Sequence, residues 1–159
     1  MKYLISACLV GHPVRYDGQH CLQQKIKMLI DTDQAVVICP EISGGLSTPR
    51  APAEIQKGTG SDVLSGHAKV FDLSGKDVTE AFILGAKQTL AFAKKHGITH
   101  AILKAKSPSC GFGQIYDGSF SGTKINANGV TAALLKQHGI HIMTEKEFLG
   151  QLTKIESAT

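Results

Sequence analysis

Three cysteines stand where the sequence predicts the ends of buried strands: Cys8, Cys39 and Cys110. Each closes or follows a short apolar run, and these runs cover residues 2–7, 35–38 and 101–104. The carboxyl ends of strands in an open parallel sheet share one edge, and ligands bind outside that edge. The sequence therefore predicts that the three thiols converge, although they lie far apart in the chain.

Convergent thiols indicate soft-metal chemistry. Thiolates select zinc, copper(I) or iron–sulfur clusters. A [4Fe–4S] cluster held by three cysteines leaves one iron open, and that iron can act as a Lewis acid toward a sulfur-containing substrate. A zinc site with three cysteine ligands and an open fourth position is an alternative, and a single nucleophilic cysteine with an acidic partner is another. The residues alone leave these alternatives open.

Two further side chains with useful chemistry lie beside the cysteines in the chain. Glu41 comes two residues after Cys39, and Ser107 comes three residues before Cys110. A carboxylate beside a metal site can act as a general acid or base, and a hydroxyl can hold a substrate or a water molecule. The structural alternatives are a solvated loop charge or an anchor for Arg50 in the case of Glu41, and a turn-capping hydroxyl in the case of Ser107.

The chain contains only two arginines, Arg15 and Arg50, and each lies in a loop that follows a cysteine-terminated strand. Arginine is suited to planar, bidentate recognition of anions and carbonyl-rich ligands. Both are therefore candidates for contacting a substrate, as is Ser109 in the same loop as Cys110; a plain surface role is the alternative for the arginines. Cys21 falls at the start of a predicted helix and is expected to be a bystander.

The elements that must position these residues alternate between strands and helices. Expected strands cover residues 2–7, 35–39, 68–73, 101–104 and 140–143. Expected helices cover residues 20–30 and 128–138, a stretch from the capping-box pattern at 77–80 to Gly97, and a final stretch that opens with a capping box at 144–147. Residues 40–52 are expected to form a long shaped loop. This order predicts one three-layer α/β domain over residues 1–159, with a parallel or mostly parallel Rossmann-like or flavodoxin-like sheet and helices on both faces.

Composition narrows the class of protein. The 159 residues are 42% hydrophobic and 19% charged, and no apolar run approaches the roughly 20 residues of a membrane helix. The first residues are too short in their apolar part for a secretory signal, and the four cysteines contain no C-x-x-C pair, so a cytoplasmic protein without a disulfide framework is expected. A net charge of +4 with scattered lysines gives no strong nucleic-acid signal. A nucleotide-binding module is disfavoured because no G-x-G-x-x-G or P-loop pattern follows the first strand.

Several motifs in order along nearly the whole chain resemble the DUF523 family, which includes the iron–sulfur thiouracil desulfidases. The motifs lie at residues 6–11, 14–18, 39–41, 44–46, 49–50, 77–79, 107–111 and 115–118. The resemblance implies a [4Fe–4S] cluster held by Cys8, Cys39 and Cys110, with one open iron. It also implies that Glu41 and Ser107 are catalytic.

The implied reaction removes sulfur from 2-thiouracil or a similar thiolated base and gives uracil and hydrosulfide without net redox change. Glu41 would activate water or relay protons, and Ser107 would assist by hydrogen bonding or proton transfer. A cluster-holding or zinc-thiolate sulfide carrier without turnover is the alternative. The sequence leaves open whether the substrate is a free base, a nucleoside or a nucleotide, and whether the chain forms a homo-oligomer. An open iron is exposed to oxidation, so aerobically prepared protein is expected to lose the cluster.

Overall fold

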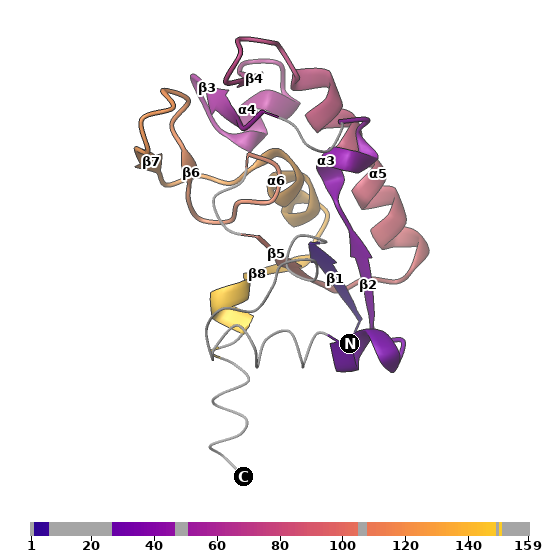
Figure 1. Cartoon of the computed structure of the whole chain (residues 1–159). Coiled ribbons are helices and arrows are strands. Elements are labelled where there is room, and N and C mark those ends of the chain that lie inside the picture. The colour runs from indigo at the N-terminus through magenta and orange to yellow at the C-terminus, as the bar shows by residue number, and fades with distance from the viewer. Residues whose placement is uncertain (1, 7–26, 47–50, 105–107, 149, 151–159) are drawn as a thin grey trace.

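The computed structural model describes residues 2–6, 27–46, 51–104, 108–148 and 150 (Figure 1). Its strands are β1 (Tyr3–Ser6), β2 (Ala35–Ile38), β3 (Ala53–Gln56), β4 (Lys69–Asp72), β5 (His100–Leu103), β6 (Ile115–Tyr116), β7 (Lys124–Ile125) and β8 (His141–Thr144). Its helices are α3 (Pro40–Ser43), α4 (Gly60–Leu64), α5 (Thr79–Lys95) and α6 (Val130–Gln137), and residues 27–31 and 145–148 are also helical.

Four parallel strands form the main sheet, in the order β2-β1-β5-β8. The strands are short and apolar, as strands buried on both faces of a sheet are. The register sets Ser6, the last residue of β1, opposite Ile38 at the end of β2. The predicted parallel α/β sheet is therefore confirmed.

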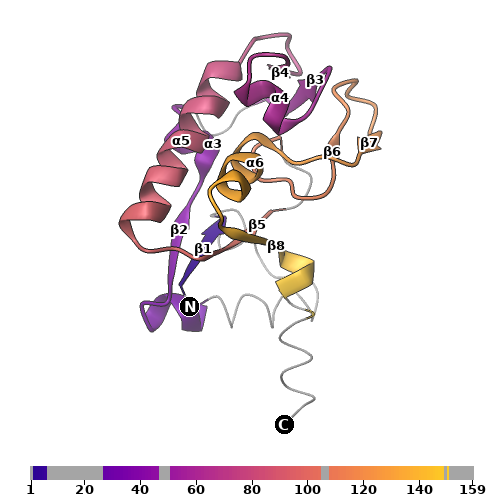
Figure 2. The same cartoon turned by 180° about the vertical axis from the view of Figure 1, so that it is seen from behind.

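Helices flank both faces of this sheet. Alternating strand residues divide between two cores: Leu4 and Leu103 pack with α5 and α6, whereas Ile5 and Ile102 pack with the helical residues on the other face. The second face is covered by helical segments that contribute Leu29 and Phe148. Figure 2 shows α5 and α6 side by side on one side of the strands. The predicted three-layer arrangement follows from this alternation, because successive residues of a strand point to opposite faces.

A third core lies beyond the sheet, around the antiparallel pair β3–β4, the helix α4 and the small hairpin β6–β7 (Figure 1). Phe82 of α5 and Val130 of α6 are buried in it, so both helices extend past the sheet. Of the elements of this core, β3, α4, β6 and β7 lie in stretches for which the sequence predicts no strand or helix.

Two other local predictions are wrong. Residues 40–43 form the helix α3 instead of a loop, because Pro40 at its first position has a φ suited to a helix start and Gly44 lets the turn pack closely on α5. The pattern at 77–80 is not a capping box: Val78 is the N-cap of α5 and makes no side-chain cap, while the Asp77 carboxylate accepts from the N–H of Thr79.

The helix ends predicted from other signals are confirmed. Gly97 follows α5 with φ +65°, and Gly139 follows α6 with φ +82°. The Thr144 hydroxyl accepts from the N–H of Glu147 at 3.1 Å, as expected of the final capping box. Among the described residues, none of the helices has the length and apolar character needed to cross a bilayer.

Candidate metal and substrate site

Cys110 lies at the carboxyl edge of the sheet, in contact with the end of β1. The Ser6 hydroxyl donates to the Cys110 sulfur across 3.6 Å, although 104 positions separate the two residues. Both side chains are buried. The contact exists because β1 and β5 are neighbours in the sheet, so the loop after β5 returns over the end of β1. The tertiary fold therefore brings the Cys110 thiol to the end of β1, the strand that precedes Cys8 in the chain.

The loop that carries Cys110 is fixed by the start of α6. The carbonyls of Pro108 and Ser109 accept from the N–H groups of Val130 and Thr131, at 2.8 and 2.9 Å. These N–H groups belong to the first turn of a helix and have no partners within it. The contact is close because Gly129 has no side chain: a Cβ there would lie 2.5 Å from the Ser109 carbonyl oxygen. The loop therefore sits on α6 by backbone contacts.

Asn128 joins this loop to the third core. Its side-chain oxygen accepts from the N–H of Gly113 at 2.9 Å, beyond Cys110 in the same loop. Its main-chain carbonyl accepts from the N–H of Gly60 at 2.8 Å, at the start of α4. The Cys110 loop is thus held between the sheet and the third core.

Cys39 and Glu41 are positioned by α3. Cys39 directly follows β2 and is the N-cap residue of α3, and Glu41 lies in the first turn of that helix. The helix packs on α5 through two glycines, since a Cβ on Gly44 would lie 2.0 Å from the Ala81 carbonyl and a Cβ on Gly85 would lie 2.0 Å from the Pro40 carbonyl. Cys39 and Glu41 are both half-buried. Backbone contacts therefore fix the position of both residues.

These contacts place Cys39 and Cys110, the two predicted ligands among the described residues, at one edge of the sheet. Ser6 lies opposite Ile38, the last residue of β2, and Cys39 follows Ile38 directly, while Cys110 contacts Ser6. Cys8 is two residues beyond Ser6 in the chain. Cys8, Arg15, Cys21, Arg50 and Ser107 lie outside the described residues, and their predicted roles stay predictions.

The hydroxyl of Ser109, which was predicted to contact substrate, is 1% exposed and lies 2.7 Å from the hydroxyl oxygen of Thr131. It also lies 4.0 Å from the Cys110 sulfur. Its predicted contact with substrate stays a prediction, and the observed contacts place it beside the thiol.

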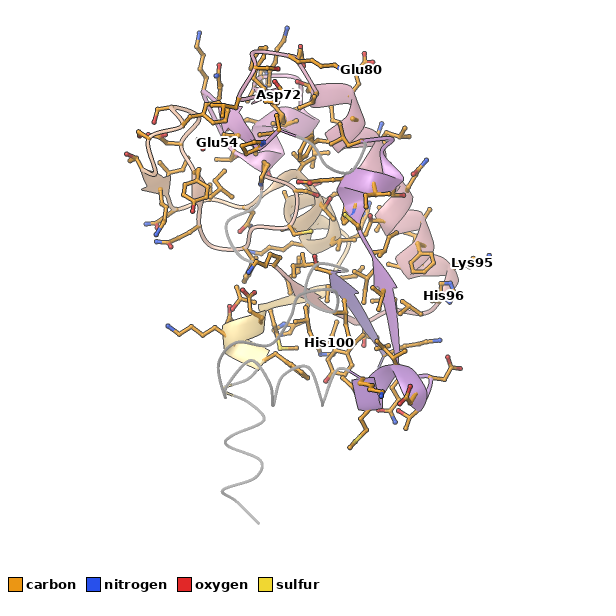
Figure 3. The ribbon with its side chains drawn as sticks, in the orientation of Figure 1. Glu54, Asp72, Glu80, Lys95, His96 and His100 are labelled. Atoms are coloured by element: carbon orange, nitrogen blue, oxygen red, sulfur yellow. The ribbon has the colours of Figure 1, made fainter. Side chains whose placement is uncertain are left out.

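The segment at 115–118, one of the motifs noted in the sequence, is held by a buried carboxylate. Glu54 of β3, labelled in Figure 3, accepts from the N–H groups of Gly118 at 3.0 Å and Phe120 at 3.2 Å. Asp117 accepts from the hydroxyl and the N–H of Ser119, and these hydrogen bonds hold the pKa of the Asp117 carboxyl below its usual value. The motif is thus a rigid turn joined to the third core.

The described donors fit an iron–sulfur cluster. Two thiols come from separate strand ends, and one of them is buried among apolar side chains and hydroxyls. Cysteine thiolates are the usual ligands of such clusters. Among the described residues no three histidine, cysteine or acidic side chains form a metal-binding group. The predicted third ligand, Cys8, falls outside that set.

Sequence reasoning did not select Ser6, Asn128, Gly129 or Thr131 as part of the site. Ser6 carried a usable signal, since it is a hydroxyl residue two positions before a cysteine at a strand end. The other three carried none, because their roles depend on how α6 meets the loop after β5. Such a meeting is set by the tertiary fold.

Comparison with known proteins gives three findings. The model of a family described as 2-thiouracil desulfurase matches residues 3–147. The uncharacterized protein YbbK of Bacillus subtilis (strain 168) is 55% identical over 144 residues, which cover 91% of this chain and 95% of that protein. The solved structure of a [4Fe-4S]-dependent thiouracil desulfidase, TudS (DUF523Vcz), is similar with a TM-score of 0.79 and 41% identity, and the match covers 99% of each chain.

Proposed function

Because the chain belongs to the 2-thiouracil desulfurase family, we propose that it is an iron–sulfur-dependent desulfidase. Its reaction replaces the thiocarbonyl sulfur of a thiolated pyrimidine such as 2-thiouracil with oxygen from water. The products are uracil, hydrosulfide and a proton: the carbon–sulfur double bond is replaced by a carbon–oxygen double bond whose oxygen comes from water, and no electron donor is consumed. One observation carries the proposal: the Cys110 thiol contacts Ser6 at the end of β1. Ser6 pairs with Ile38, the residue before Cys39, and Cys8 follows Ser6 by two residues in the chain.

We assign the cluster ligands to Cys8, Cys39 and Cys110. Three thiolates leave one coordination position of a [4Fe–4S] cluster to be filled from outside the protein. When bound, such a cluster supplies a Lewis-acidic iron that polarises the carbon–sulfur bond of a coordinated substrate. Backbone contacts fix the two described residues of this set, Cys39 and Cys110.

Glu41 is the proposed general base. Its half-buried carboxylate lies two residues from Cys39 in the chain, in the first turn of α3. The close contacts at Gly44 and Gly85 fix the position of α3 on α5. A carboxylate there can take a proton from the attacking water and pass it to the departing sulfur. Ser107 is proposed, from the family resemblance, to hydrogen-bond the reacting group or relay the same proton.

The substrate class is a small thiolated base, nucleoside or nucleotide. We propose that Arg15 and Arg50 recognise its carbonyl or anionic groups. A phosphate-bearing substrate would give both arginines a charged partner. The choice among the three forms can be made by comparing kcat/KM for 2-thiouracil with that for its nucleoside and nucleotide.

We also propose a single domain over residues 1–159, because α5 and α6 contribute residues both to the sheet core and to the third core. From the sequence we further propose that the protein is cytoplasmic, has little affinity for nucleic acid and can form homo-oligomers.

The test of Glu41 is a Glu41→Gln variant with Glu80→Gln as the matched control. Both glutamates lie in the first turn of a helix, and Glu80, labelled in Figure 3, is exposed at the start of α5. Hydrosulfide release should fall by roughly 10²-fold or more in Glu41→Gln, the usual effect of removing a general base, with iron content unchanged. Glu80→Gln should match the parent. Equal release from Glu41→Gln would exclude this role, and a parent that holds the cluster without turnover would favour a sulfide carrier.

A further inference from the structure

Cys110 is the described thiol whose surroundings are most completely defined. It is 4% exposed and belongs to the apolar core that contains Leu4, Leu103 and Leu135. Two hydroxyls reach its sulfur inside this apolar setting: that of Ser6 at 3.6 Å and that of Ser109 at 4.0 Å. A hydrogen bond in such surroundings is stronger than the same bond in water, because the local dielectric constant is low.

The two hydroxyls differ in what they can do. The Ser109 hydroxyl lies 2.7 Å from that of Thr131, a much closer partner than the sulfur at 4.0 Å. The Ser6 hydroxyl donates to the sulfur in the observed arrangement, at a distance within the range of hydrogen bonds to sulfur. A thiolate that ligates a metal has no proton and can only accept a hydrogen bond, and of the two hydroxyls that of Ser6 is the one that donates to the sulfur.

We infer that Ser6 is a positioning residue whose hydroxyl hydrogen-bonds the Cys110 thiolate when that thiolate is a cluster ligand; the inference rests on the proposed function. Ser6 is 2% exposed and sits at the end of the central strand β1, so its hydroxyl has a fixed origin. Groups that hydrogen-bond a metal ligand orient it and tune the metal. The bond would draw electron density from the sulfur and so leave the iron it ligates more electron-poor.

This inference has a consequence apart from turnover. Hydrogen bonds to the sulfurs of an iron–sulfur cluster are among the factors that set its reduction potential. Removing the Ser6 hydroxyl should therefore shift the reduction potential to more negative values. The change should also weaken retention of the cluster, because a ligand that has lost its hydrogen bond is oriented less firmly.

The experiment compares Ser6→Ala, Ser6→Thr and the parent, all purified without oxygen. Ser6→Ala should show a more negative potential and roughly 10-fold faster iron loss to a chelator. Ser6→Thr, which keeps a hydroxyl at the same carbon, should restore both values toward those of the parent. Thr89→Val is the matched control: the Thr89 hydroxyl is also fully buried, but it bonds to the carbonyl of Gly85 within α5.

Four outcomes separate the claims. A shifted potential in Ser6→Ala with recovery in Ser6→Thr supports the inference. An unshifted potential in a cluster-loaded Ser6→Ala protein overturns it and leaves the proposed function intact. A parent that holds no iron–sulfur cluster overturns both. If Ser6→Ala fails to fold, Ser109→Ala decides between the two hydroxyls near the sulfur. A potential equal to the parent's in that variant supports Ser6 as the donor, and a shift to a more negative potential overturns the inference.

Discussion

The two edges of the main sheet are built from the same four strands but are finished in different ways. At the amino edge, rings close the strand starts: Tyr3 packs on His100 with centroids 5.6 Å apart, and His100 packs on His141 at 5.3 Å. Main-chain hydrogen bonds tie neighbouring starts together, such as the N–H of Tyr3 to the carbonyl of Gln34 and the N–H of His141 to the carbonyl of Thr99. Figure 3 shows His100 at this end, far from Glu54 and Asp72.

At the carboxyl edge, the segments that follow the strands take the place of the packed aromatic rings of the amino edge. There the chain is held by backbone contacts at glycines, such as Gly129 against Ser109 and Gly44 against Ala81. Such contacts position a loop without using its side chains. The predicted site residues Cys39, Glu41 and Cys110 lie at this edge, whereas the rings at the amino edge pack on one another.

The largest effect on stability is expected from filling one of these backbone contacts. Gly129→Ala adds a Cβ that would lie 2.5 Å from the Ser109 carbonyl and 2.6 Å from the Pro108 carbonyl. Overpacking of this kind costs roughly 1–3 kcal/mol, and here the backbone carrying Cys110 must move. Chemical denaturation should show the loss of stability, and iron analysis should show reduced cluster content.

Gly150→Ala is the control for that substitution, because a Cβ at Gly150 would meet no heavy atom of the described residues within 4 Å. It should leave both stability and iron content close to those of the parent. Normal cluster content in a folded Gly129→Ala protein would contradict the claim that backbone contacts position the Cys110 loop.

A smaller effect is expected at the amino edge, where pH acts on the ring cluster. Partial burial, followed by the charge of His141 and of the N-terminus, lowers the pKa of His100 below its usual value of 6.5. The unfolded chain then binds a proton more readily than the folded protein does. The contribution of neutral His100 to the free energy of unfolding should therefore be complete above pH 6.5 and decrease as the pH falls below that value.

Urea unfolding between pH 7.5 and 5.5 or so would measure this slope. His100→Phe should flatten it, and His141→Gln should flatten it less, because burial is the larger cause of the shift. An unchanged slope in His100→Phe would show that the amino edge does not control this pH dependence. Both variants should contain as much cluster as the parent, because the substituted residues lie at the amino edge and the predicted cluster ligands lie at the carboxyl edge.

The sequence predicts the parts of this comparison that depend on local pattern. The apolar runs of β1, β2, β5 and β8 mark the sheet, and glycines mark the ends of α5 and α6. Convergence of strand-end thiols follows from the general geometry of parallel sheets. The observed contact between Ser6 and Cys110 agrees with it.

The parts that escaped prediction depend on contacts between distant segments. The helix α3 forms in a stretch with three prolines and two glycines, because Gly44 meets Gly85 on α5. β6 pairs with β7 over two residues, too few for any periodic signal. Ser6 meets Cys110, and Thr131 meets Ser109, only after β1, the loop after β5 and α6 have been assembled. No local pattern encodes such encounters.

The central claim is that three strand-end thiols hold a [4Fe–4S] cluster that turns over a thiolated pyrimidine. The most direct measurement is iron, acid-labile sulfide and visible absorption of anaerobically purified protein, with hydrosulfide release from 2-thiouracil assayed on the same sample. We predict a brown protein with about four iron atoms per chain. Cys8→Ala, Cys39→Ala and Cys110→Ala should each abolish the colour and the activity, whereas Cys21→Ala should retain both. A colourless parent that carries stoichiometric zinc after anaerobic reconstitution would contradict the account.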